Sequence, residues 1–115
     1  MTVNDIIKIL DAEIIMASDL NTEVKSACGS DMMSDVLAYV KDQSVLITGL
    51  VNPQVVRTAD MMDIKCIVFV RGKEPDETVI ELAREKMITL ISTKLRMFTA
   101  CGLLYTHGLR GGCEI

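Results

Sequence analysis

The spacing of hydrophobic positions changes repeatedly along this chain. From Val3 to Leu10 they follow the 3.6-residue period of a helix, which Thr2 can cap and which is expected to run to about Asp11. Two short runs that contain isoleucine or valine, residues 13–17 and 24–28, are typical of strands. The beginning of the chain is therefore predicted to form one helix followed by two strands.

A second helix is predicted after Gly29. Ser30 is a favourable N-cap residue, Asp31 is expected in the first turn, and the helix is expected to end near Lys41. Because they follow the helical period, the residues expected on its buried face are Met32, Met33, Val36, Leu37 and Val40.

From residue 45 onward, strands and helices are predicted to alternate three times. The strands are expected at 45–47, 65–70 and 89–92, and the helices from Pro53, from Pro75 and over 96–107, the last ended by Gly108. Short loops between alternating strands and helices favour parallel strands covered on both faces. The predicted fold class is therefore α/β, a small three-layer α/β/α sandwich with a mostly parallel sheet.

Length and composition fit one domain. The chain has 115 residues, 50% of them hydrophobic, which is enough for one buried core and not for two. Residues 1–110 are predicted to form the domain, and residues 111–115 a C-terminal tail that is mobile unless contacts hold it. Because the chain has only two Phe and two Tyr, aliphatic and methionine side chains must fill the core. Met32-Met33 and Met61-Met62 are interpreted as core residues, with an adaptable contact surface as the alternative.

Charge and hydropathy limit the partners. The formal net charge is −4 and the basic residues are scattered, so nucleic acid is not an expected partner. The first residues lack the pattern of a secretion signal, and no run of eighteen apolar residues occurs without a charge. A cytoplasmic protein without a membrane partner is expected.

The four cysteines do not form a recognisable metal motif. Cys28, Cys66, Cys101 and Cys113 are far apart in the sequence, and the single histidine, His107, has no ligand spacing to them. Reduced thiols, the first three partly buried, are expected, with no metal and no cofactor.

The three strand-to-helix loops are the expected binding site, because ligands of such sheets bind beyond the carboxyl ends of the strands. Backbone N–H groups, small residues and cations in these loops could together hold an anion such as a phosphate. Ordinary turn and capping chemistry is the alternative, since neither GxGxxG nor a P-loop motif is present. The candidate ligand-binding residues are Thr48, Gly49, Asn52, Arg71, Gly72, Lys73, Ser92 and Thr93.

Three function classes stay open. The first is a non-catalytic, dimeric binding or regulatory module whose loops recognise a small anionic ligand, a nucleotide included, or a protein partner. The second is a small enzyme that uses Asp31 and Asp35, four residues apart on one helical face, or Cys28. The third is an accessory protein of a redox or metalloenzyme system whose cysteines carry the chemistry.

Several segments, taken in order, resemble the DRTGG domain family over nearly the whole chain. They are Cys28-Gly29-Ser30-Asp31-Met32-Met33-Ser34-Asp35-Val36-Leu37, Leu46-Ile47-Thr48-Gly49, Ile67-Val68-Phe69-Val70-Arg71-Gly72, and Leu90-Ile91-Ser92-Thr93-Lys94 with Met97-Phe98. The resemblance implies a fold like the N-terminal domain of HPr kinase/phosphorylase, a homodimer, and a regulatory or ligand-sensing task. It implies no kinase activity, because that activity belongs to a separate P-loop domain.

The chain departs from the family at the residues for which the family is named. The Asp-Arg pair is expected in the loop after Thr48, where this chain has Leu50-Val51-Asn52-Pro53. The Thr-Gly-Gly is expected after the next strand, where this chain has Val70-Arg71-Gly72. Arg71 and Arg57 are the candidates for a replacement cation.

Overall fold

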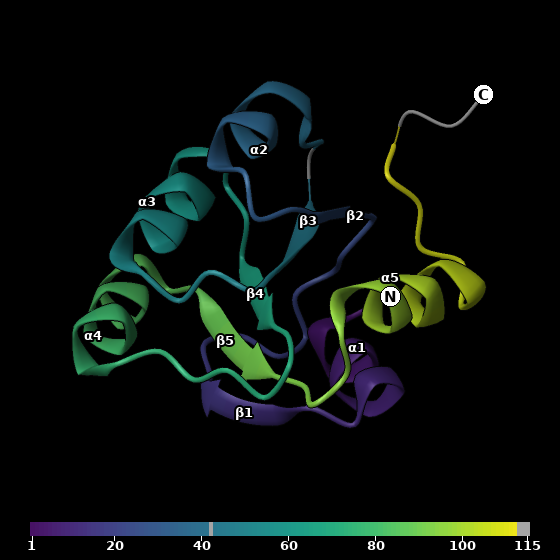
Figure 1. Cartoon of the computed structure of the whole chain (residues 1–115), viewed down its shortest axis with the longest axis horizontal. Helices are drawn as coiled ribbons and strands as arrows, with labels where there is room; N and C mark the ends of the chain where they lie inside the picture. The colour runs from purple at the N-terminus through teal and green to yellow at the C-terminus, as the bar shows by residue number, and fades with distance from the viewer. Residues whose placement is uncertain (42, 113–115) are drawn as a thin grey trace.

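A five-stranded sheet lies between two layers of helices (Figure 1), as described for residues 1–41 and 43–112 of a computed structural model. The α/β class and the three-layer arrangement predicted from the sequence are confirmed. The elements in chain order are α1 (Val3–Leu10), β1 (Glu13–Met16), β2 (Ser26–Gly29), α2 (Met33–Tyr39), β3 (Ser44–Thr48), α3 (Pro53–Met61), β4 (Cys66–Phe69), α4 (Glu77–Lys86), β5 (Thr89–Ser92) and α5 (Met97–Thr106).

The sheet is parallel except at one edge. Its strand order is β1-β5-β4-β3-β2. Strands β2, β3, β4 and β5 run parallel to one another, with Val45 of β3 opposite Cys66 of β4, which in turn lies opposite Thr89 of β5. Strand β1 pairs antiparallel with β5. All four parallel strands therefore end at the same edge of the sheet.

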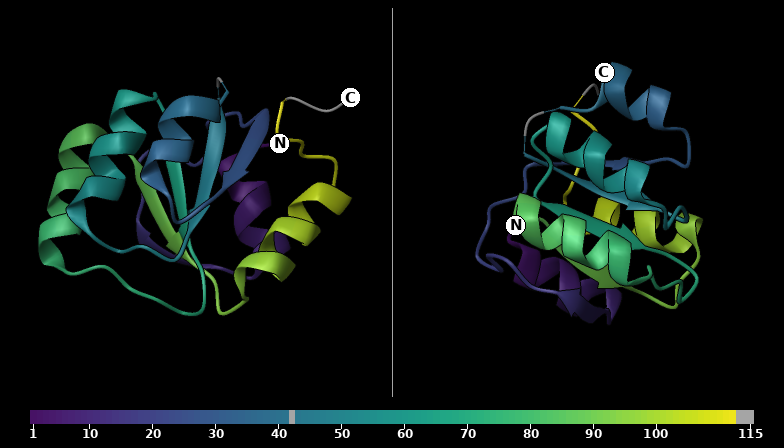
Figure 2. Two further views of the ribbon diagram at one scale, coloured as in Figure 1. Left: turned by 45° about the horizontal axis from the view of Figure 1, so that its top comes forward. Right: turned by 90° about the vertical axis from the view of Figure 1, so that its left-hand side faces the viewer.

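Each face of the sheet has its own buried cluster. Helices α1 and α5 cover one face, and α2, α3 and α4 cover the other (Figure 2). Alternate residues of each central strand point to opposite faces, so Ile47 packs with the first group of helices while Leu46 packs with the second. Every residue of β3, β4 and β5 is buried, which explains their apolar centres; the polar residues Ser44, Thr48, Thr89 and Ser92 lie at strand ends.

Local capping signals place most helix ends correctly. Thr2 caps α1 through the N–H of Asp5, α3 begins at Pro53, and Gly108 has a φ of +106° after α5, all as predicted. Helix α4 begins two residues after Pro75, because the side chain of Asp76 accepts a hydrogen bond from the N–H of Val79.

The start of the second helix was predicted wrongly. Helix α2 begins at Met33, and Ser30 does not cap it; the hydroxyl of Ser30 accepts a hydrogen bond from the N–H of Met32 instead, at 2.9 Å. Helix α2 also ends at Tyr39, before Lys41. Of its predicted buried face only Val36 is fully buried, and Met32 is 60% exposed. The core interpretation also fails for Met61, whose side chain is 71% exposed.

The segment after α5 pairs with the edge of β2 at Arg110. The carbonyl of Arg110 accepts a hydrogen bond from the N–H of Ala27 at 2.9 Å, and Leu109 is buried against the α1/α5 face. Gly111 and Gly112 follow as exposed residues. The rest of the predicted tail, residues 113–115 with Cys113, lies outside the described residues.

Candidate functional site

The three strand-to-helix loops meet at the carboxyl edge of the parallel strands, where the sequence placed the candidate site. Backbone hydrogen bonds join two of them directly: the N–H of Arg71 donates to the carbonyl of Leu95, and that of Gly72 to the carbonyl of Thr93, each at 2.8 Å. The hydroxyl of Ser92 donates to the carbonyl of Lys73 at 2.8 Å. The loops after β4 and β5 therefore form one tied unit.

A carboxylate and a guanidinium meet at the loop after β3. Oδ1 of Asp31 accepts hydrogen bonds from the hydroxyl of Thr48 at 3.0 Å and from the N–H of Gly49 at 2.7 Å. A Cβ on Gly49 would lie 2.7 Å from Nη2 of Arg71 and 3.5 Å from Oδ1 of Asp31. The missing side chain of Gly49 is thus what allows the Arg71 guanidinium to approach this backbone so closely.

Arg71 and Gly72 form a left-handed bend at the end of β4. Their φ angles are +61° and +66°. Glycine adopts this conformation without cost, whereas a side chain such as that of Arg71 is uncommon there. The exposed Arg71 side chain extends over Gly49, while Gly72 faces the loop after β5, so the bend connects two parts of the candidate site.

The second part is a cavity of about 450 Å³ beside Gly72, Ser92 and Thr93. Its far wall is the turn between α1 and β1, which is attached by a hydrogen bond of 2.8 Å from the hydroxyl of the buried Thr93 to the carbonyl of Leu10. The charged lining residues are Asp11, Glu13, Glu74 and Lys94. This wall was missed from the sequence, because no local pattern shows that β1 pairs with β5.

Three candidates do not join the strand-end cluster. The side chain of Asn52 caps α3 by accepting a hydrogen bond from the N–H of Val55 at 3.2 Å. Arg57 lies on α3 in a shallow depression between α3 and α4, lined by three glutamates. Asp35 lies on α2 as an exposed residue, but Asp31 precedes that helix, so the prediction of two carboxylates on one helical face is wrong.

The environment of the described thiols opposes nucleophilic chemistry. Burial raises the pKa of Cys28, and the nearby Asp35 carboxylate raises it further. Burial also raises the pKa of Cys101, and it raises that of Cys66 to about 12. Within residues 1–41 and 43–112, no three Cys, His, Asp or Glu side chains cluster as a metal site would require. The described residues therefore give no support to a catalytic Cys28 or to a cysteine-borne metal.

Cys66 is expected to resist alkylation in the native protein at pH 8. A pKa of about 12 leaves a thiolate fraction roughly 1,000-fold below that of a thiol of ordinary pKa, and its side chain is 1% exposed. Mass spectrometry after iodoacetamide treatment should show no label on Cys66 and slow labelling of Cys28 and Cys101. Because these pKa values are raised, the rates should increase as the pH rises through 9. Full labelling in urea is the control, and native labelling of Cys66 at the rate of a cysteine peptide would contradict the assignment.

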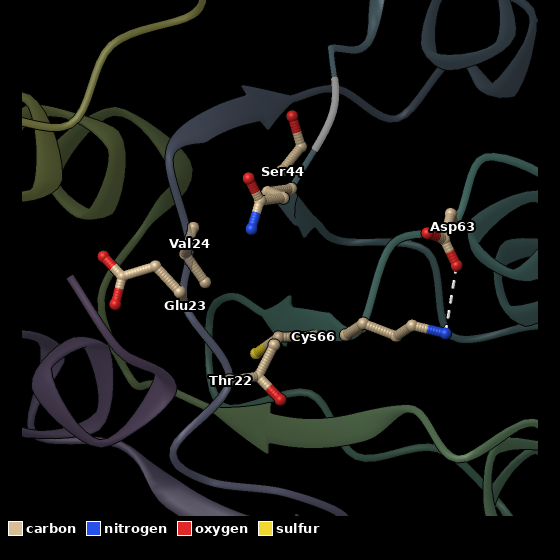
Figure 3. A pocket seen from close by; sticks show the side chains of 8 residues that line it. Thr22, Glu23, Val24, Ser44, Asp63 and Cys66 are labelled. Carbon is tan, nitrogen blue, oxygen red and sulfur yellow. Dashed lines mark ion pairs between the residues drawn. The ribbon is translucent and has the colours of Figure 1, made fainter.

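A smaller cavity of about 230 Å³ lies at the opposite, amino-terminal edge of the strands (Figure 3). Ser44 and Cys66 are among its lining residues, and Lys65 forms an ion pair with Asp63 at 3.0 Å. The hydroxyl of Ser44 shares a hydrogen bond with that of Ser26 and donates to the carbonyl of Lys41 at 2.8 Å. Ser44, Asp63 and Lys65 thus have partners within the protein, and the cavity contains none of the candidate residues.

Comparisons with known proteins agree with this architecture. A family model described as the DRTGG domain matches residues 5–106. Among solved structures, the CBS and DRTGG domains of the regulatory region of Clostridium perfringens pyrophosphatase, complexed with its activator diadenosine tetraphosphate, superpose with a TM-score of 0.75 at 21% sequence identity. The match covers 90% of this chain and 45% of that chain, so this chain spans less than half of that region. No curated protein matched the chain. Among the described residues, no helix is long and apolar enough to span a membrane.

Proposed function

This chain belongs to the DRTGG domain family, and we propose on that premise that it is a non-catalytic regulatory module that binds a small anionic ligand at its strand-end loops. The solved relative is the regulatory region of an enzyme and is complexed with a nucleotide activator. At 21% identity that likeness establishes only the shared fold, so the ligand must be argued from the residues of this chain.

The observation that carries the proposal is the position of the Arg71 guanidinium. It lies over Gly49 at the end of β3, and among the described residues it forms no ion pair. An exposed guanidinium that forms no ion pair is well suited to bind the oxygens of a phosphate or carboxylate. Lys94 is a second cation in this region, since it lines the adjacent cavity and its Cγ lies 4.0 Å from the position of a Cβ on Gly72.

A nucleotide fits the mixed charge of this edge better than a bare anion. The cavity beside Gly72 bears the carboxylates of Asp11, Glu13 and Glu74, which repel phosphate and can accept hydrogen bonds from sugar hydroxyls. Its volume of about 450 Å³ is in the range of small-molecule sites. Phosphates would therefore lie toward Arg71 and Lys94, and the nucleoside toward the turn between α1 and β1.

The same chemistry favours binding over catalysis. The Asp31 carboxylate is engaged by Thr48 and Gly49, and the Cys28 thiol has a raised pKa. A nucleophile would need a lowered pKa or an adjacent base. The imidazole of His107, the C-cap residue of α5, does not act as that base for Cys28. Its Nδ1 is instead paired with the carbonyl of Leu103, at 2.8 Å.

The outer face of α5 is the proposed dimer surface. Phe98 is 90% exposed and Tyr105 53% exposed, while the space beside Gly102 is open. In an antiparallel pairing of two copies, Phe98 of one α5 would face the open Gly102 position of the other, which makes the surface self-complementary. No residue of α5 itself is charged, and the charge nearest Tyr105 is the Arg110 guanidinium, which stacks on its ring at 3.8 Å. The Phe98 and Gly102 part of this face can therefore pair through apolar contacts.

The ligand proposal is tested by thermal unfolding with adenine and guanine nucleotides, diadenosine tetraphosphate and inorganic phosphate. A ligand at a hundred times its dissociation constant adds about 2.7 kcal/mol, which should raise the Tm by several degrees. Arg71→Ala is expected to weaken binding at least about tenfold through loss of a charge-assisted contact. Arg57→Ala, which removes the same charge on α3, is the matched control and should leave affinity within about twofold. Absence of a shift with every compound would overturn the proposal and favour a protein partner.

A further inference from the structure

We propose that the Asp31 carboxylate occupies the place of the ligand's anionic group in the free protein, so that ligand binding displaces Asp31 and releases the start of α2. This inference rests on the proposed function, because it concerns the same strand-end site. Asp31 then competes with the ligand's anionic group for the same donors. The position of α2 would depend on whether the ligand is bound.

The surroundings of Asp31 are those of an anion site. One oxygen, Oδ1, accepts hydrogen bonds from a buried hydroxyl, that of Thr48, and from a backbone N–H, that of Gly49. The hydroxyl of Thr48 also accepts a hydrogen bond from the N–H of Leu50 at 3.2 Å, so its proton is directed toward the carboxylate. The Arg71 guanidinium lies on the same side of Gly49. A phosphate oxygen would find the same three donors if Asp31 left.

The contact continues the pairing of β2 with β3 beyond its last backbone hydrogen bond, which the N–H of Ser30 donates to the carbonyl of Ile47 at 3.0 Å. Asp31 lies in the loop between β2 and α2, and its partners are 17 and 18 residues further along the chain. Its own position before α2 gives the helix no side-chain cap, since the N-cap residue is Met32. Beyond Ser30, the two hydrogen bonds of Asp31 therefore attach the α2 entrance to the end of β3.

Helix α2 is suited to move when this tie is lost. It has seven residues, of which only Val36 is buried, and no basic residue in its last turn. Its N-cap residue Met32 is 60% exposed, and two apolar side chains within the helix, Leu37 and Tyr39, are 42% and 70% exposed. An element with so few buried contacts opens at low free-energy cost. Displacement of Asp31 would thus change an apolar surface that a partner could recognise.

Thermodynamic linkage determines whether removal of Asp31 raises or lowers the affinity for the ligand. A ligand that must displace Asp31 binds more weakly than it would to a site already open. Isothermal titration with inorganic pyrophosphate at low ionic strength is therefore expected to show about 10- to 100-fold tighter binding to Asp31→Ala than to the wild type. Asp31→Asn, which keeps an acceptor oxygen and loses the charge, should bind with intermediate affinity.

Asp35→Ala is the matched control, because it removes the same charge from an exposed position four residues away. It should change the affinity by no more than about twofold. Circular dichroism of each variant checks that the fold is retained. If Asp31→Ala binds pyrophosphate no more tightly than Asp35→Ala while wild-type binding still depends on Arg71, this inference is wrong and the proposed function stands. If neither the wild type nor any variant binds pyrophosphate or a nucleotide, both are overturned.

The release of α2 is measured separately by hydrogen exchange. Amides of residues 33–39 should exchange faster in the wild type when pyrophosphate is added, and equally fast without it in Asp31→Ala. Amides of β4, which is buried along its whole length, provide the internal reference. Unchanged exchange in α2 at saturating pyrophosphate would overturn the displacement of Asp31.

Discussion

Replacing Phe69 with alanine is expected to lower the free energy of unfolding by about 3–5 kcal/mol. Phe69 is fully buried, at 0% exposure, and packs into the cluster under α2, α3 and α4. It is also the last residue of β4, two positions before Arg71, so loss of its packing loosens the strand end that carries the site. Equilibrium urea unfolding followed by circular dichroism measures the change.

Phe69→Leu is the matched control, since it keeps an apolar side chain and removes only part of the volume. It should cost about 1–2 kcal/mol. If Phe69→Ala and Phe69→Leu lower the free energy of unfolding equally, the Phe69 side chain is not packed as described. A loss of more than about 5 kcal/mol approaches the whole stability of an ordinary domain, in which case the alanine variant would be isolated unfolded.

Replacing Phe98 with aspartate is expected to weaken self-association at least about 100-fold, which corresponds to about 2.7 kcal/mol. The aromatic ring is 90% exposed in the single chain, so its burial can only come from another surface. In the proposed pairing it fills the space beside Gly102 of the second copy, where a buried, unpaired carboxylate would be strongly unfavourable. Sedimentation velocity over a range of protein concentrations measures the effect.

Met61→Asp provides the comparison on another face. Met61 lies on α3 and is 71% exposed, so the variant adds the same charge to an exposed apolar position away from α5. It should leave the dimer constant nearly unchanged. A wild-type chain that stays monomeric at all concentrations would contradict the dimer and leave the α5 face for a different partner. If Phe98→Asp and Met61→Asp both dissociate the dimer, the interface is not confined to α5.

The residues at the site differ from those of the family motif. Where the resemblance led us to expect an Asp-Arg pair, the chain has Leu50-Val51. The structure nevertheless brings a carboxylate from Asp31 and a guanidinium from Arg71 to Gly49, just before these residues. Of the two replacement cations considered from the sequence, Arg71 is the one at the strand ends.

The sequence alone determined most of the local structure. The apolar runs of β3, β4 and β5 were recognised because strands covered on both faces need no polar positions. The starts of α1 and α3 and the end of α5 followed from Thr2, Pro53 and Gly108, whose effects act within one helical turn. The mostly parallel order followed from alternation with short loops, which leaves few topologies.

Only the tertiary structure decided how distant segments meet. The antiparallel pairing of β1 with β5 adds the turn after α1 to the cavity, and the contact of Asp31 with Gly49 takes Asp31 out of the predicted helix. Both depend on hydrogen bonds between residues 17 to 83 positions apart, such as those of Asp31 with Thr48 and of Thr93 with Leu10. Periodicity and capping preferences act over a few residues, so they contain no information about which distant donor a carboxylate will find.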